Sequence, residues 1–180
     1  IYYLMWSSHD TRDPRYCVNY ATGPSPMGPF TPAKRYGFDD MYAYNNGHDY
    51  YRIRYWHNED GPFRMIDYAP RIETELALKA IRSHRQSQPN RPFCLIMGWG
   101  PPHWSSVRKE RRYGDYPQEY DFYDPTRLTV PDNVPLQFRD FARKELADYY
   151  GMVTSLDDCM GRLLRELDEL GLSDDTIVCF

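Results

Sequence analysis

Apolar residues recur at intervals of three and four positions along one long segment, from Phe138 to Leu170. The recurring positions are Leu146, Tyr149, Val153, Leu156, Met160, Leu163, Leu167 and Leu170. This spacing places the side chains along one face of an α-helix, and such a face must be buried against another element. The pattern therefore predicts one long helix, or two abutting helices, packed on a sheet.

Further helix and strand patterns surround this segment. A helix of about four turns is predicted from Pro70, because apolar residues recur at helical spacing up to the breaker "QSQPNRP". Residues 93–99 form a continuous apolar run between prolines and glycines, which is typical of a strand covered on both faces. Residues 176–180 follow Gly171 and the turn "LSDD", and they predict another buried strand.

The order of the predicted elements indicates the fold class. The first residues, "IYYLMW", also resemble a buried strand, so strands and helices alternate along the chain. Alternation of this kind favours an α/β fold, here a mixed and largely parallel sheet flanked by helices. A chain of 180 residues is sufficient for one domain. Residues 7–38 and 108–135 are rich in polar and turn-forming residues, and they are expected to be irregular.

Composition excludes several classes of partner. The net charge of −4 gives no broad attraction to nucleic acid or to an anionic membrane. No apolar run approaches the roughly 18 residues of a membrane-spanning helix. The four cysteines are widely separated and lie near no histidine at a metal-site spacing, which argues against a zinc site.

A single histidine follows the predicted strand at 93–99. In the stretch "GWGPPHW", His103 lies between Pro102 and Trp104. Ligands of open α/β sheets bind outside the carboxyl ends of the strands, so this position suits chemistry. A histidine in a loop could equally form a hydrogen bond with nearby backbone, and its position alone does not separate the two interpretations.

Three segments of the chain carry a resemblance to a known family. The run "PFCLIMGWGPPHW" resembles the sulfatase pattern of a strand that ends in Pro-His. The segment "LADYYGMVTSLDDCMGRLLRELDELGLSDDTIVCF" is similar to the helix and strand that precede the family's S-D-H-G metal motif, and "YGFDDMYAYNNGHDYY" resembles its "GFD" segment. The resemblance covers nearly the whole chain, which is identified as the central part, residues 1–180, of one sulfatase catalytic domain in the alkaline phosphatase superfamily.

The resemblance implies a hydrolase of sulfuric esters that uses a formylglycine nucleophile and a divalent cation, usually calcium. His103 matches the histidine of the Pro-His pattern, which implies a contact to sulfate and a role as general acid. The transition state gathers negative charge on the sulfate oxygens and on the departing alkoxide, so cations and a proton donor must converge there. An ordinary imidazole titrates near pH 6.5 and can supply that proton.

The chain also departs from the family pattern. The nucleophile motif C-x-P-x-R, the paired metal-binding aspartates and the S-D-H-G motif are absent, so formylglycine and the calcium ligands are expected outside this chain and no metal ligand is assigned within it. Where the family reads Y-x-G-K-W-H, alignment on Trp6 places Met5 and Ser7 at the positions of the lysine and histidine. His9 could replace them after a loop shift or could be an ordinary surface residue. The chain alone is expected to be inactive.

A second cluster suggests the substrate. The family places a histidine-aspartate stretch near the substrate pocket, and the segment holds His48, Asp49, Tyr50 and Tyr51. Histidine and carboxylate can bond to sugar hydroxyls, and aromatic rings can stack on a pyranose. His48, Asp49, Tyr50 and Trp104 are therefore predicted to bind a sulfated carbohydrate or another sulfated small molecule. The alternative is a polar turn whose tyrosines, like Trp104, pack in the core.

Two other functions remain open. A phosphohydrolase or phosphonate hydrolase of the same superfamily would share the fold and differ at the nucleophile and metal ligands. A binding protein that has lost catalysis would keep the cleft for a sulfated ligand, as Met5 and Ser7 suggest. Neither the nucleic-acid-binding nor the membrane class is favoured.

Overall fold

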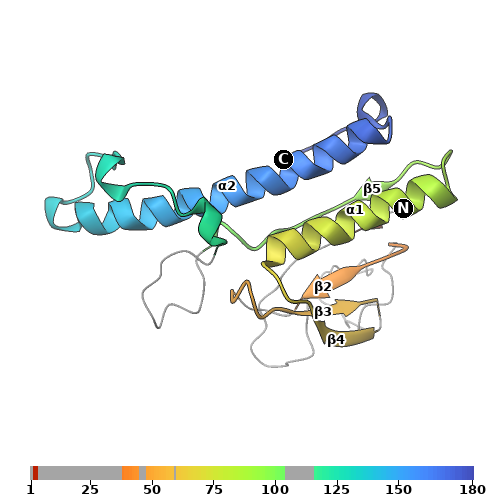
Figure 1. Cartoon of the computed structure of the whole chain (residues 1–180), viewed down its shortest axis with the longest axis horizontal. Helices are drawn as coiled ribbons and strands as arrows, with labels where there is room; N and C mark the ends of the chain where they lie inside the picture. The colour runs from red at the N-terminus through yellow and green to blue at the C-terminus, as the bar shows by residue number, and fades with distance from the viewer. Residues whose placement is uncertain (1, 4–37, 45–47, 59, 104–115) are drawn as a thin grey trace, which may run out of the picture.

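Two long helices and two small sheets form the described part of the molecule (Figure 1). The computed structural model describes residues 2–3, 38–44, 48–58, 60–103 and 116–180. The elements in chain order are β1 (Tyr2–Tyr3), β2 (Tyr42–Tyr44), β3 (Arg54–His57), β4 (Asp60–Arg64), α1 (Ala69–Ser87), β5 (Cys94–Leu95) and α2 (Arg139–Glu169). Short 3-10 helices are η2 (Gln118–Tyr120), η3 (Pro125–Arg127), η4 (Leu136–Phe138) and η5 (Ser173–Asp175).

Helix α1 confirms the first predicted helix and is longer than expected, at 19 residues. Pro70 occupies its first turn, where the missing backbone N–H of proline costs no helical hydrogen bond. The backbone N–H of Ala69 donates to the carbonyl of Tyr50 at 2.8 Å. The start of α1 is thereby tied to the turn at residues 48–51.

Helix α2 is one continuous helix of 31 residues, which is the first of the two predicted arrangements. It ends as the sequence predicts, because Gly171 adopts a left-handed φ of 64°. The N–H of Leu172 then donates to the carbonyl of Leu167 at 2.8 Å, and the N–H of Gly171 to that of Asp168 at 3.0 Å. These two bonds satisfy carbonyls that the last helical turn would otherwise leave unpaired.

The apolar face of α2 is buried near its C-terminal end, but its main partner differs from the prediction. Leu163 and Leu167 pack with Ala77, Leu78 and Ile81 of α1, and these five residues form the aliphatic core. Figure 1 shows the two helices running side by side along this contact. The sheet contributes only the segment around β5, because α1 presents an aliphatic face of its own to α2.

The parallel strand pair is shorter than the sequence predicts. Within residues 93–99 only Cys94 and Leu95 form a strand, which pairs in parallel with Tyr2 and Tyr3 of β1. The predicted strand at 176–180 is wrong for this structure. Ile177 and Phe180 are 92% and 97% exposed, and no described residue pairs with this segment. A strand requires a neighbour for its backbone hydrogen bonds, so an apolar run without one remains irregular.

An antiparallel sheet of three strands in the order β2-β3-β4 was not predicted. Tyr42 pairs with His57 between β2 and β3, and Tyr55 pairs with Phe63 between β3 and β4. The sheet packs beneath the start of α1 through a second core, called the tyrosine core. Its buried members are Tyr44, Tyr50, Ile53, Tyr55, Tyr68, Ala69 and Ile72. With the parallel β1–β5 pair, the described strands form a mixed arrangement.

Among the described residues, neither α1 nor α2 is long and apolar enough to cross a membrane.

Candidate functional site

His103 lies in the turn that follows β5, where the sequence predicts it. Its backbone N–H donates to the carbonyl of Gly100 at 3.3 Å, which closes the turn through the two prolines. Pro101 is buried, whereas His103 is exposed. The turn thus anchors the backbone of His103 and leaves its side chain accessible to a ligand.

The structure brings His103 against the turn at residues 48–51. The imidazole rings of His48 and His103 stack with their centroids 4.1 Å apart and their planes 14° from parallel. The two residues are distant in sequence, and the structure places their rings in direct contact.

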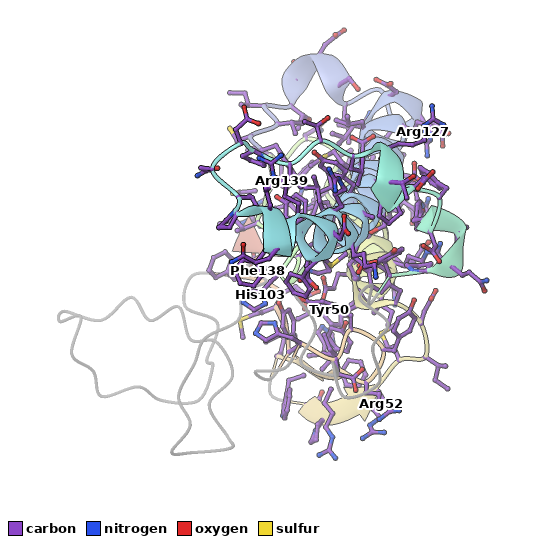
Figure 2. The ribbon with its side chains drawn as sticks, turned by 90° about the vertical axis from the view of Figure 1, so that its left-hand side faces the viewer. Tyr50, Arg52, His103, Arg127, Phe138 and Arg139 are labelled. Atoms are coloured by element: carbon purple, nitrogen blue, oxygen red, sulfur yellow. The ribbon has the colours of Figure 1, made fainter. Side chains whose placement is uncertain are left out.

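Tyr50 contacts both histidines of the pair. Its hydroxyl donates to the backbone carbonyl of His103 at 2.8 Å and lies 3.4 Å from Nδ1 of His48. Figure 2 shows Tyr50 beside His103. The Tyr50 ring passes so close to Gly100 that a Cβ there would lie 2.5 Å from Cε1 of the tyrosine. Glycine in "GWGPPH" therefore provides the space that this ring needs.

The burial of Tyr50 favours the packing interpretation of this residue. Its side chain is 1% exposed and belongs to the tyrosine core, where its ring meets Tyr68 edge to face. Stacking of Tyr50 on a sugar would require the ring to leave that core. Tyr51, by contrast, is 41% exposed.

Asp49 shapes the same turn. Its Oδ1 accepts a long hydrogen bond from the backbone N–H of Tyr51 at 3.4 Å, and its Oδ2 lies 3.7 Å from Nε of Arg52. Asp49 is partly exposed, so the carboxylate that stabilises the turn also faces solvent near His48. Trp104, Met5, Ser7 and His9 lie outside the described residues.

A groove of about 580 Å³ begins at His103 and continues along the first half of α2. We call it the α2 groove. Its walls include Val130 from the segment before η4, Phe138 at the end of η4, and Phe141, Glu145 and Tyr149 from α2. Figure 2 shows Phe138 next to His103. The sequence interpretation missed this groove, although Tyr149 was part of the predicted helical stripe.

A buried glutamate lies next to the tyrosine core, in contact with Tyr55. Glu73 of α1 is 0% exposed, and its Oε1 accepts a hydrogen bond from the hydroxyl of Tyr55 at 3.2 Å. Its Oε2 has no hydrogen-bond partner among the described residues. Burial raises the pKa of Glu73 well above its usual value, and the bond from Tyr55 opposes that rise only in part. Burial likewise raises the pKa of Tyr55. Neither group is accessible to a substrate.

The described residues do not fit the calcium of a sulfatase, and the cysteines of the sequence do not fit its formylglycine. Within the described ranges, no group of three or more histidine, cysteine, aspartate or glutamate side chains could hold a metal ion. Cys94, Cys159 and Cys179 are free thiols, and none of the four cysteines lies in a C-x-P-x-R motif.

Comparison with known proteins identifies the family. The chain matches the Sulfatase family over residues 7–180. An ulvan-active sulfatase from Formosa agariphila is 32% identical over 154 residues, which cover 84% of this chain and 28% of the relative. An endo-4-O-sulfatase from Bacteroides thetaiotaomicron is 24% identical over 156 residues, which cover 84% of this chain and 30% of the relative. The chain belongs to the sulfatase family of the alkaline phosphatase superfamily.

Solved structures agree on the fold. A structure from a study of glycosaminoglycan metabolism by Bacteroides thetaiotaomicron has a TM-score of 0.62 and 21% sequence identity, and it matches 81% of this chain and 32% of that one. The chain therefore carries part of the α/β fold of the alkaline phosphatase superfamily, as the sequence predicts. It spans about 30% of the length of the relatives that it matches.

Proposed function

We propose that the whole protein is a sulfuric ester hydrolase that acts on a sulfated carbohydrate, and that His103 serves its reaction. The observation that carries the proposal is the His48–His103 ring pair, which lies beyond the carboxyl end of β5 in a chain of the sulfatase family. The relatives support the substrate class, since one is named for ulvan and another for 4-O-sulfate.

The proposed chemistry of His103 follows from the charge of the reaction. Cleavage of a sulfate ester leaves negative charge on the oxygen of the departing alcohol, and a sugar alkoxide is a poor leaving group. A general acid that donates a proton to this oxygen accelerates such a step by about 10²- to 10⁴-fold. His103 is exposed, and its backbone is fixed at Gly100 and Tyr50, so the imidazole can be held against that oxygen.

We assign the neighbouring residues to binding. His48 covers one face of the His103 imidazole and can contact a sulfate oxygen or a hydroxyl from its own edge. Asp49 can accept hydrogen bonds from hydroxyl groups. Tyr50 is a positioning residue, because its hydroxyl reaches both histidines from the tyrosine core. Trp104 stays a predicted substrate contact.

The remaining chemistry belongs to other parts of the protein. Family membership suggests a metal and a formylglycine, and we propose that the metal is calcium. Neither group is held by the residues described here, so no step of the reaction is derived through them.

The direct test is sulfate release by the whole protein from ulvan and glycosaminoglycan oligosaccharides, measured by ion chromatography. We expect turnover by the wild type and a large loss in His103→Ala. Phosphate and phosphonate esters of the same alcohols provide the comparison. Hydrolysis of those esters without release of sulfate would instead support the phosphohydrolase alternative, and binding of sulfated glycan without turnover would support the catalytically inactive one.

A further inference from the structure

We infer that the β2-β3-β4 sheet binds a sulfated polysaccharide on the face that is turned away from the tyrosine core. Arg54 of β3 and Arg64 of β4 form this second binding surface, which we call the arginine face. The inference rests on the proposed function, because the chemical class of the partner is that of the proposed substrate.

The alternation of side chains along β3 and β4 separates the two faces of the sheet. Tyr55 and Phe63 lie opposite each other, with their ring centroids 6.3 Å apart. Tyr55 belongs to the tyrosine core and Phe63 packs against it. Successive side chains of a strand point to opposite faces, so Arg54 and Arg64 point away from that core. Both arginines are exposed.

The arginine face is separate from the site at His103. Tyr50, which bonds to the backbone of His103, belongs to the tyrosine core on the inner side of the sheet. Figure 2 shows Arg52, two residues before Arg54, apart from His103. Neither Arg54 nor Arg64 lines the α2 groove. A ligand on the arginine face therefore leaves the proposed catalytic site open.

Arg54 and Arg64 form a cross-strand pair of equal charge, because the strand register places them directly opposite each other. Side chains in such positions have Cβ atoms about 4.5–5.5 Å apart, and like charges there repel. Neither guanidinium group forms an ion pair within the described ranges. Arg71, Arg82 and Arg162, by contrast, each pair with a glutamate. An anion between Arg54 and Arg64 would remove their repulsion.

The chemistry of the pair suits the sulfate groups of a polymer. A guanidinium group is a planar fork that donates two parallel hydrogen bonds to an oxyanion, and sulfate presents the oxygens that such a fork requires. A single exposed ion pair binds weakly. A polysaccharide that carries many sulfate groups can occupy the arginine face and the catalytic site together, which raises the effective concentration of the substrate at His103.

Binding and turnover of the whole protein test the inference separately. The probes are ulvan and heparin, immobilised for surface plasmon resonance. Replacement of both arginines, Arg54→Gln with Arg64→Gln, should weaken binding of the two polymers about tenfold. The kcat and KM for a small aryl sulfate should stay within about twofold. Arg127→Gln is the matched control, because Arg127 is also exposed and lies in η3, outside the sheet.

A charge reversal separates binding from a structural role. Arg54→Glu turns the repulsive pair into an attractive one, so it should raise the urea midpoint of unfolding and still weaken binding of both polymers. Unchanged binding in the double variant, or an equal loss in Arg127→Gln, would overturn the inference. Equally tight binding of single-stranded DNA through the same arginines would overturn the assignment to a polysaccharide.

The two proposals fail in different ways. Sulfate release by the wild type, together with unchanged polymer binding in the double variant, would overturn the arginine face and uphold the proposed function. Binding that depends on Arg54 and Arg64 in a protein that releases no sulfate would defeat the proposed hydrolase and uphold the arginine face.

Discussion

The two halves of α2 share one periodic pattern and differ in what covers it. In the C-terminal half, Leu156, Leu163 and Leu167 are 7%, 7% and 6% exposed. In the N-terminal half, Phe141, Tyr149 and Val153 are 52%, 44% and 39% exposed. The C-terminal half packs on α1, whereas the N-terminal half borders the groove at His103. Apolar spacing thus defines a face, but the neighbouring element decides whether that face is buried in a core or lines a groove.

Two tyrosines from the segment before α2 form hydrogen bonds with the helix. The hydroxyl of Tyr116 donates to Asp148 at 3.0 Å, and that of Tyr120 donates to Asp158 at 2.8 Å. The ring of Tyr116 passes over Gly151, where a Cβ would lie 2.7 Å from it. These contacts fix the segment before α2 to the helix, and the first of them bonds one oxygen of Asp148, which lines the groove.

The largest expected effect concerns sulfate ester hydrolysis and calcium binding, for which neither half of α2 is sufficient. The 180-residue chain by itself should hydrolyse no sulfate ester, because proton transfer from His103 contributes only about 10²- to 10⁴-fold. It should also bind no stoichiometric calcium, since a calcium site needs about six to eight oxygen ligands. An aryl sulfate assay with excess calcium and a calorimetric titration measure both. Turnover that His103→Ala abolishes, or tight binding of one calcium ion, would show that the active site has been misplaced.

Truncation of one buried side chain in the C-terminal half of α2 should cost more stability than truncation of an exposed one in the N-terminal half. Leu163→Ala creates a cavity in the aliphatic core and should lower the free energy of unfolding by about 2–5 kcal/mol. Val153→Ala in the N-terminal half of α2 should lower the free energy of unfolding by less than about 1 kcal/mol. Urea unfolding followed by circular dichroism gives both values. Similar losses in the two variants would show that both halves of α2 contribute equally to stability.

The buried carboxyl of Glu73 should make stability depend on pH. Its pKa is raised in the folded chain by burial, so the folded state keeps the proton while the unfolded state releases it as pH rises above the ordinary glutamate range. Stability should therefore fall with rising pH, by up to about 1.4 kcal/mol per pH unit, until pH exceeds the folded-state pKa.

Glu73→Gln provides the matched comparison for this effect. Glutamine keeps the acceptor for Tyr55 and cannot ionise, so the variant should gain stability over the wild type at neutral pH and lose that advantage at pH 4. Urea midpoints measured between these two values check the sign. A difference independent of pH would assign the effect to packing.

The smallest effect is expected at an exposed ion pair in the N-terminal half of α2. Nη1 of Arg143 lies 2.9 Å from Oδ1 of Asp140, whose side chain is 93% exposed. Exposed pairs of this type contribute about 0–1 kcal/mol and weaken with salt. Asp140→Asn should shift the urea midpoint only slightly, and less at high salt. A shift as large as that of Leu163→Ala would mean that this half is stabilised in another way.

Local patterns predicted the helices well. The periodic positions and Gly171 define α2, and Pro70 and the breaker after Ser87 define α1, because helical hydrogen bonds join residues close in sequence. Strands depend on partners far along the chain, which explains why residues 176–180 were predicted wrongly and why the β2-β3-β4 sheet was missed. The alternating residues of "YRIRYWH" were the available signal for β3.

The site could be predicted only in part for a similar reason. His103 was found from its place after β5, and its proximity to His48 was expected from the family resemblance. The α2 groove was missed because its walls come from segments that are distant in sequence, with Pro102 and His103 on one side and residues 130–152 on the other. The burial of Glu73 was also missed, because it depends on the contact with Tyr55 from another element.

Proton donation from His103 to the departing alcohol can be tested with a series of leaving groups. The whole protein and His103→Ala are compared on sulfate esters whose alcohols range from acidic phenols to sugars, and kcat is measured for each. The variant should lose little activity on esters of acidic phenols and about 10²- to 10⁴-fold on sugar esters, because only poor leaving groups need the proton. An equal loss across the series would contradict general acid catalysis and assign His103 to sulfate binding.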